Sequence, residues 1–208
     1  MERGDAARQL ILATAERLFA ERGVAAVSGR HIGEAAGQRN SAAVGYHFGT
    51  KADLVSAVLR SHSDPIERRR QEMVDALPAD AGLRDWVACL VRPSTDHLAE
   101  LGDPTWFARL RAQLVTDPAL RFLMVEDSAR SEVLPRVVEG LRSCVAHLPP
   151  AVYEERRAME VQLLVHGCAD RERALAEGRP PLRATWHEAA TGIVDALVGL
   201  WRAPVSAP

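Results

Sequence analysis

Lysine, cysteine and aromatic residues are scarce in this chain of 208 residues. Only one of its 26 basic residues is a lysine, Lys51, which we attribute to coding composition. The cysteines Cys89, Cys144 and Cys168 are too far apart for a disulfide framework or a zinc knuckle, which indicates a reducing compartment. No apolar run reaches the roughly 18 residues of a membrane span, and the first residues have no signal-peptide pattern. We therefore expect a cytoplasmic protein without a membrane partner, a structural metal or a cofactor.

Proline is absent before Pro65, and no segment has the alternating Val, Ile and Thr pattern of a strand. Six of the fourteen glycines lie in residues 23–49, whereas all twelve prolines come later. The sequence predicts an all-α fold, with short helices joined by glycine turns and then longer helices separated by prolines. We expect an N-terminal head of residues 1–63, a helical body of residues 64–202 and a flexible tail of residues 203–208.

Some of the later prolines predict boundaries or interruptions of helices. Asp64 and Pro65 form the pair of acid and proline that begins many helices, so we expect a helix to start there. Pro93 and Pro135 lie inside helical patterns, and we expect each of them to kink or split its helix.

Charge is unevenly distributed along the chain, although the net charge is only −2. Residues 1–63 carry eight basic and six acidic side chains, a net charge of +2, so the remainder carries −4. A mildly basic head on an acidic body is compatible with phosphate binding at one end. By itself this distribution does not indicate a nucleic-acid partner.

The head has the pattern of a first helix from Arg8 to Arg22 and a short second helix. The apolar residues of the first helix follow helical spacing and predict one buried face of Ile11, Ala15, Leu18 and Phe19. Gly23 can take the left-handed conformation that ends this helix. Ser28 can cap the second helix, which ends at Gly37. Its expected inner face consists of Ile32, Ala35 and Ala36.

A tight turn separates the second helix from a third. Gln38 and Arg39 form this turn, and Asn40 or Ser41 can then cap the third helix. The segment 50–53, Thr-Lys-Ala-Asp, is a variant of the capping box and predicts a fourth helix. Two short helices that are joined by a tight turn and held by a first helix form a helix-turn-helix arrangement. Its second short helix fits the major groove of DNA, which is roughly 12 Å wide.

Polar side chains gather at the turn, where the start of the third helix would face the bases. Arginine suits guanine, and asparagine or glutamine suits adenine. The helix starts at Ser28 and Thr50 can offer backbone N–H groups to phosphates. Alternatively, Gln38, Arg39 and Asn40 are ordinary polar turn residues.

Residues 8–59 resemble the N-terminal DNA-binding domain of the tetracycline-repressor (TetR) family of bacterial transcriptional regulators. The matching residues, in order and in register, are Ile11, Leu12, Leu18, Phe19, Gly23, Ser28, Ile32, Ala35, Ala36, Gly37, Tyr46, His47, Phe48, Gly49, Thr50, Lys51 and Leu54. Between Gly37 and Phe48 the chain is one residue longer than the commonest family pattern, which leaves open which side chain faces which base.

The resemblance implies phosphate contacts at Ser28, Tyr46 and Lys51 and base contacts between Arg39 and Gly45. The candidate DNA-binding residues are Ser28, Gln38, Arg39, Asn40, Ser41, Ala42, Gly45, Tyr46, His47 and Lys51. Simpler explanations stay open, because Tyr46 can close the small core and Lys51 can be a surface charge at a helix start.

Two glycines lie inside the short helices. Gly33 and Gly45 each cost roughly 1 kcal/mol relative to alanine at such a position. We interpret them as points of close approach by another helix or by the DNA backbone.

The body has two helical patterns that the resemblance assigns to a dimer interface. The last helix carries apolar residues at steps of 4, 3, 4 and 3, the spacing of helices packed at roughly +20°. The candidate interface residues are Val161, Leu164, Val165, Cys168, Trp186, Ala190, Ile193, Leu197 and Leu200. In the family that the chain resembles, the last two long helices pair with their copies, which gives the helix-turn-helix two half-sites. Alternatively, both patterns are core within one chain.

The resemblance also implies a small-molecule pocket in the body, with ordinary core as the alternative. The candidate lining residues are Trp86, His97, Trp106, Phe107, Leu110, Phe122 and His166. His166, Cys168 and Asp170 have no evident fourth partner, so we expect no metal site. The chain has no nucleophile elbow, phosphate loop or paired-carboxylate motif, so we expect no enzyme.

We expect a homodimeric transcriptional regulator that represses by binding a partly palindromic DNA operator and is released by a small-molecule inducer. Two other classes stay open. One is an all-helical protein-binding dimer without DNA binding, and the other is a small helical enzyme.

Overall fold

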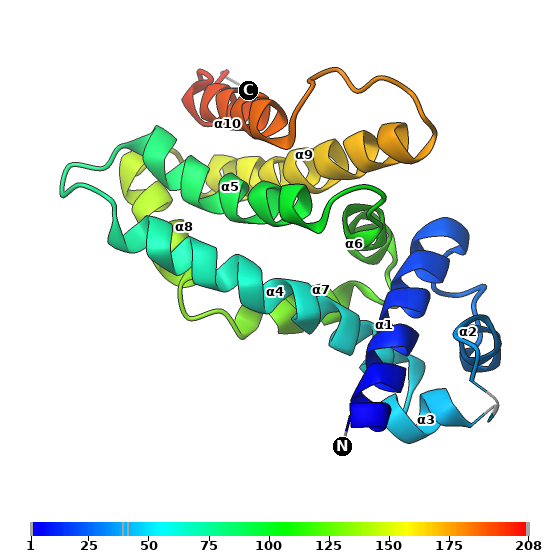
Figure 1. Ribbon diagram of the computed structural model, residues 1–208. Coiled ribbons are helices and arrows are strands. Elements are labelled where there is room, and N and C mark those ends of the chain that lie inside the picture. The colour runs from blue at the N-terminus through cyan, green and yellow to red at the C-terminus, as the bar shows by residue number, and fades with distance from the viewer. Residues whose placement is uncertain (1, 39, 41, 207–208) are drawn as a thin grey trace. The chain divides into compact units, whose positions relative to one another are not determined.

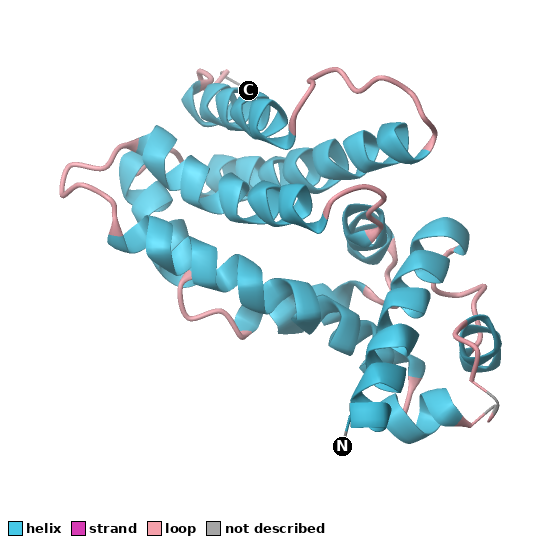
Figure 2. Cartoon of the chain, in the orientation of Figure 1, coloured by secondary structure: helices cyan, strands magenta, loops and turns pink. Residues whose placement is uncertain are grey.

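The computed structural model describes residues 2–38, 40 and 42–206, and all regular secondary structure in this part of the chain is helical (Figure 2). The helices are α1 (Glu2–Arg22), α2 (Gly29–Ala35), α3 (Ala43–Phe48), α4 (Lys51–Asp75), α5 (Leu83–Leu101), α6 (Phe107–Thr116), α7 (Arg121–Ala129), α8 (Leu134–Cys144), α9 (Pro150–Ala176) and α10 (Trp186–Arg202). The all-α prediction is therefore confirmed. Within the same described residues, no helix is long and apolar enough to cross a membrane.

The chain divides into two compact units. Unit 1 consists of the residues up to Asp64 together with residues 105–129, and so contains α1, α2, α3, the start of α4, α6 and α7. Unit 2 consists of residues 65–104 and the residues from Arg130 onward, with the rest of α4, α5 and α8 to α10 (Figure 1). Helices α6 and α7 thus pack with N-terminal helices that are distant in sequence. The expected domain boundary at residue 63 stays a prediction.

The core of unit 1 forms between α1 and the start of α4. The face predicted for α1 is buried, with Ile11, Ala15, Leu18 and Phe19 at most 1% exposed. Leu54, Val55, Val58 and Leu59 of α4 are buried to the same degree. Helix α1 begins at Glu2, six residues before the start that we predicted.

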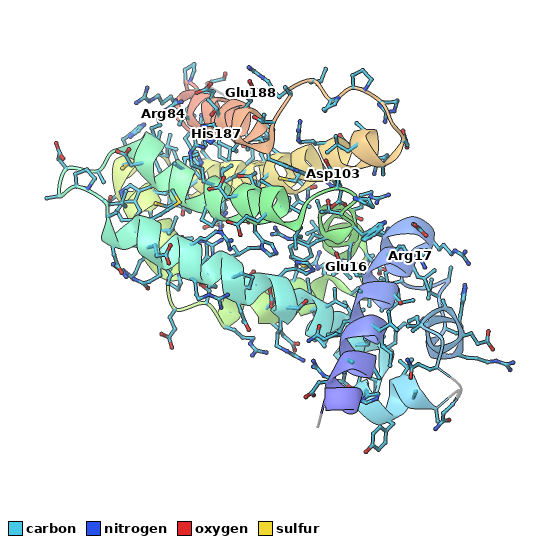
Figure 3. The ribbon with its side chains drawn as sticks, viewed as in Figure 1. Glu16, Arg17, Arg84, Asp103, His187 and Glu188 are labelled. Carbon is cyan, nitrogen blue, oxygen red and sulfur yellow. The ribbon has the colours of Figure 1, made fainter. Side chains whose placement is uncertain are left out.

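Helix α6 is attached to α1 and α4 by polar and aromatic contacts. The imidazole Nε2 of His62 on α4 lies 3.0 Å from a carboxylate oxygen of Glu16 on α1, which Figure 3 labels beside Arg17. The same imidazole stacks on the ring of Phe107 on α6, with the ring centroids 3.9 Å apart. The side-chain amide of Gln113 donates to the carbonyl of Ala20 at 3.0 Å. These contacts join α6 to α1.

The structure corrects the helix start expected at Pro65 and the splits expected at Pro93 and Pro135, and a kink at Pro93 stays a prediction. Pro65 lies inside α4 and begins no helix, Pro93 lies inside an unbroken α5, and Pro135 lies in the first turn of α8. Proline in a helix leaves the carbonyl four residues earlier without its usual donor. In α5 that carbonyl is the one of Cys89, and the guanidinium Nε of Arg70 on α4 donates to it at 3.4 Å. A side chain from another helix thus replaces the lost hydrogen bond, and α5 continues.

Unit 2 is built around α5, which packs against α8 and α10, while α9 also packs on α10. Arg84 of α5 pairs with Asp195 of α10 at 2.5 Å. Arg92 of α5 contacts the imidazole of His187 on α10 at 3.2 Å. Figure 3 labels Arg84 and His187 on these two helices. The polar contacts flank an apolar seam and fix α10 along α5.

The end of α10 is held by a buried polar cluster on α9. The guanidinium of Arg156 donates to the carbonyls of Trp201 at 2.9 Å and Ala203 at 2.7 Å, so it caps the last turn of α10. The indole N–H of the fully buried Trp201 donates to the carboxylate of Glu160 at 2.7 Å. Burial raises the pKa of Glu160, and the nearby charge of Arg157 acts in the opposite direction.

Trp86 of α5 rests on the backbone of α8 at Gly140. A Cβ atom at Gly140 would lie well inside contact distance of three indole atoms of Trp86. Only glycine at residue 140 therefore leaves room for the Trp86 ring to lie against the backbone of α8.

We expect Gly140→Ala to destabilise the protein by about 1–3 kcal/mol, because the added methyl group displaces the Trp86 ring. Urea denaturation followed by circular dichroism measures the change. Glu139→Ala, at an exposed position of the same helix, is the control and should stay within about 0.5 kcal/mol of the parent protein. Equal stabilities of the two variants would contradict the close approach of Trp86.

Candidate nucleic-acid interface

Helix α2 begins and ends as its sequence predicts. Ser28 is its N-cap, and the Ser28 hydroxyl accepts the backbone N–H of His31 at 3.1 Å. Gly37 follows the helix with φ +66°, a conformation that favours glycine. The two signals confine α2 to seven residues.

Helices α2 and α3 pack closely around Val44. This valine of α3 faces Gly29 and Gly33 of α2, where added Cβ atoms would lie 3.6 and 3.7 Å from its methyl groups. Since a Cβ at Gly33 would meet Val44 at ordinary van der Waals distance, the close approach inferred at Gly33 stays a prediction. The inner face of α2 contains Ile32, Gly33 and Ala36, whereas Ala35, which we placed there, is exposed. Gly29, one turn before Ile32, is half-buried on the same side of α2.

The turn between α2 and α3 is closed by its own side chains. The amide of Gln38 donates to the carbonyl of Ala36 at 3.1 Å, and Asn40 Oδ1 accepts the N–H of Ala42 at 2.9 Å. Helix α3 starts at Ala43, and its N-cap is Ala42 without a side-chain cap, so Asn40 closes a turn before the helix and does not cap it. Arg39 and Ser41 lie outside the described residues.

A groove of about 570 Å³ opens between α2, α3 and the start of α4. Its lining residues are Gly29, Arg30, Ile32, Ala42, Val44, Gly45, Tyr46, Gly49, Thr50, Lys51 and Leu54. Tyr46 is 86% exposed and so closes no core. Among the described residues, no atom apart from the chain neighbours and the backbone of α3 itself lies within 4 Å of a Cβ built at Gly45, so α3 is open to an approaching molecule there.

The start of α4 is held by the predicted capping box. The backbone N–H and the hydroxyl of Thr50 donate to Asp53 Oδ2 at 2.9 and 2.6 Å, and Thr50 Oγ1 accepts the N–H of Asp53 at 3.1 Å. The hydrogen bonds from Thr50 lower the pKa of the Asp53 carboxyl. Gly49, with φ +78°, ends α3 immediately before the box.

Two further positively charged side chains border this part of unit 1, and they were not among the candidates predicted from the sequence. Arg30 is an exposed residue of α2 that pairs with Glu34 at 2.8 Å, one helical turn along. The guanidinium of Arg8 lies over the ring of Phe48, 5.0 Å from its centroid. Gly29, Ile32 and Gly33 lie on the inner face of α2, which leaves residue 30 on its outer face. Their spacing in the sequence therefore could have predicted that Arg30 is exposed. Nothing local in the sequence indicates the contact of Arg8.

His47, the last candidate at this site, is half-buried at the end of α3. Its ring makes an edge contact with Tyr46 at a centroid distance of 5.2 Å. The imidazole of His47 therefore packs against the ring of the exposed Tyr46.

The candidate pocket residues are distributed over both units. Trp106, Phe107, Leu110 and Phe122 belong to unit 1, where Phe107 and Leu110 are core and Phe122 is 46% exposed. Trp86, His97 and His166 belong to unit 2. His97 lines a groove of about 520 Å³ between α4 and α5 with Arg68, Arg69 and Glu72 among its neighbours. A ligand site at these residues stays a prediction.

Most of the candidate dimer residues are buried inside one chain. These are Leu164, Val165, Cys168, Trp186, Ala190 and Leu197. Val161, Ile193 and Leu200 are half-buried and keep surface for a partner. The burial favours the core interpretation for the first six, and the dimer interface stays a prediction.

Two short helices locked at a tight turn, with an open groove and exposed polar groups on one side, define a helix-turn-helix DNA-binding domain. Residues 11–58 match the family model of the bacterial regulatory proteins of the tetR family. The N-terminal domain of the chain is therefore similar to that of the bacterial regulatory proteins of the tetR family. A comparison with curated proteins finds no match.

Two solved structures share the fold. The crystal structure of probable transcriptional regulatory protein RHA5900 has a TM-score of 0.57 at 21% identity, over 95% of this chain and 100% of that chain. The ketosteroid transcriptional regulator KstR2 of Mycobacterium tuberculosis has a TM-score of 0.55 at 19% identity, over 92% of this chain and 93% of that chain. These similarities extend the fold assignment beyond the N-terminal domain.

We expect Asp53→Asn to lower the melting temperature at neutral pH and to have no effect in strong acid. Because the native pKa of Asp53 is lowered, its carboxylate stabilises the fold above the unfolded pKa, roughly 3.9. This contribution is lost as the pH falls through the native pKa. Melting curves between pH 7 and about pH 2.5 measure the effect.

The control is Asp80→Asn, at an exposed loop position. This variant should melt with the parent protein throughout the range. A difference for Asp53→Asn that did not change with pH would contradict the role of the ionised carboxylate.

Proposed function

We propose that the chain is a transcriptional repressor that binds an operator as a homodimer and is released by a small molecule. The groove between α2, α3 and α4, with Tyr46 exposed at its edge, is the observation that carries this proposal. The match of residues 11–58 to the tetR-family model supports it.

The groove has the chemistry that a DNA backbone requires. Arg30 and Lys51 supply positive charge, and the exposed Tyr46 supplies a hydroxyl donor beside them. Gly45 lets the backbone of α3 approach the duplex without a Cβ atom in between. The start of α3, at Asn40 and Ala42, is exposed and can reach base edges in the major groove.

A homodimer would supply the second recognition helix. The outer side of α9 and α10 carries small and apolar groups that leave room for a neighbouring helix. Met159, Gly167 and Ala196 are exposed there, and a Cβ at Gly167 would lie 3.6 Å from Ile193. A second copy packed on this face would place two α3 helices on one duplex, at half-sites that are roughly 34–36 Å apart or a multiple of that distance.

Release by a small molecule requires that the ligand bind one arrangement of the dimer better than the other. Nearly complete release requires a difference of roughly 5.5 kcal/mol. We place the sensing function in unit 2, where the groove beside His97 offers polar and charged groups.

We expect Tyr46→Ala to weaken operator binding at least about tenfold, or ~1.4 kcal/mol, with unchanged thermal stability, since the side chain is exposed. The operator is first selected from random duplex DNA, and fluorescence anisotropy then measures the dissociation constant. Val125→Ala removes another exposed apolar side chain from unit 1 and should bind as the parent protein does.

Gly45→Ala is a second variant for the same site. Alanine favours the helix by up to about 1 kcal/mol, so this protein should be as stable as the parent or more stable, yet bind DNA more weakly. Operator binding that is unaffected by both changes would exclude the groove as the DNA site.

We expect Ala196→Arg to produce a folded monomer with weak operator binding, because a large charged side chain then stands on the outer face of α10. Light scattering after gel filtration measures the mass. Ala99→Arg, the same change at an exposed position of α5, should leave the dimer intact. A dimeric Ala196→Arg protein would place the self-association surface elsewhere.

A further inference from the structure

The only lysine of the chain makes an unusual contact. Lys51 is the first residue of α4, and its Nζ donates to the carbonyl of Val24 at 3.0 Å and to that of Ala25 at 3.4 Å. Both carbonyls belong to the turn between α1 and α2, 26 and 27 residues away in sequence. The side chain therefore connects the start of α4 to the turn that leads into the helix-turn-helix.

In the described part of the chain, Lys51 is the donor to both carbonyls. They lie outside any helix, and among the described residues no backbone N–H of a turn or cap donates to them. The turn is also held by Val24 and Val27, which are buried in unit 1, and its two flanks are joined by the contact of the Arg22 guanidinium with the imidazole of His31 at 3.1 Å. The Lys51 ammonium adds a link from the turn backbone to the start of α4.

An ammonium group suits this place. It carries three donors around a compact charge, whereas a guanidinium presents a planar fork that matches a carboxylate or a phosphate. Two donors are used by Val24 and Ala25, and the third has no acceptor among the described residues. The other 25 basic residues of the chain are arginines, whose planar guanidinium has a different donor geometry.

The charge of Lys51 is also available to the groove that it lines. Asp53, the nearest acid in sequence, is engaged by Thr50, and in the described part of the chain Lys51 forms no ion pair. A phosphate in the groove would meet an ammonium whose other donors already hold the turn.

We propose that Lys51 is a positioning residue, which clamps the turn between α1 and α2 to the start of α4 and so sets the width of the groove for the DNA backbone. The proposal rests on the proposed DNA-binding function for its consequence, but the clamp itself exists in the free protein. If Lys51 only contacted a phosphate, its loss would leave the turn between α1 and α2 unchanged. If Lys51 only clamped the turn, its loss would affect the turn even without DNA.

The test compares Lys51→Met with Arg30→Met in the full chain. Both variants remove one positive charge from the groove, but Arg30 pairs with Glu34 and does not touch the turn. The first measurement is hydrogen exchange in the free protein at the amides of Gly23 and His31, which are hydrogen-bonded on either side of the turn. The second measurement is operator affinity as a function of salt concentration.

For Lys51→Met we expect exchange at Gly23 and His31 to be about tenfold faster and a loss of affinity that persists at high salt. For Arg30→Met we expect unchanged exchange and a loss that fades as salt rises, since the slope of log affinity against log salt falls by about 0.9 for each lost phosphate contact. Circular dichroism confirms that both proteins are folded.

If Lys51→Met behaves as Arg30→Met does in both measurements, the clamp is refuted and Lys51 is a phosphate contact only. If the parent protein binds no DNA while exchange still rises in Lys51→Met, the proposed function fails and the clamp stands. The two results are therefore distinguishable.

Discussion

The packing of Val44 against Gly29 and Gly33 is the interaction on which the rest of the DNA-binding surface depends. Helices α2 and α3 have seven and six residues, far fewer than the roughly 12–15 that an isolated helix needs. Neither can persist without tertiary contacts. Val44 fills the space between the two helices, at ordinary van der Waals distance from Cβ atoms built at Gly29 and Gly33, and so packs the two short helices together.

The groove follows from that arrangement. Because Val44 points inward, Gly45 and Tyr46 lie on the exposed side of α3, one open to approach and one projecting into solvent. The capping box of Thr50 and Asp53 then starts α4 beside them. The exposure of Gly45 and Tyr46 at the surface of the groove thus follows from the inward packing of Val44.

The local features of the head were predictable from the sequence because they depend on neighbouring residues alone. The Ser28 cap, the capping box at Thr50 and the left-handed glycines each act within about four residues, the range over which capping and turn chemistry operates. The error at Ala35 has a local cause as well. A helix of seven residues has too few apolar positions to fix the phase of its buried face, and glycine carries no hydrophobic signal of its own.

What the sequence could not predict depends on contacts between distant segments. Pro93 does not interrupt α5, and the guanidinium of Arg70 on α4 donates to the Cys89 carbonyl that the proline leaves without its backbone donor. Lys51 matches a residue to which the family resemblance gives a phosphate contact, yet in the free chain it donates to a turn 26 and 27 residues away.

The apolar seam of α10 is ambiguous because it too depends on contacts between distant segments. A spacing of 4 and 3 results whenever two helices pack at a shallow angle, within one chain or between two copies, and only the burial of Trp186, Ala190 and Leu197 shows that this stripe is occupied inside the monomer. Ile193 and Leu200 of the same stripe are only half-buried, whereas the small exposed residues on the outer side of α10 gave no hydrophobic signal.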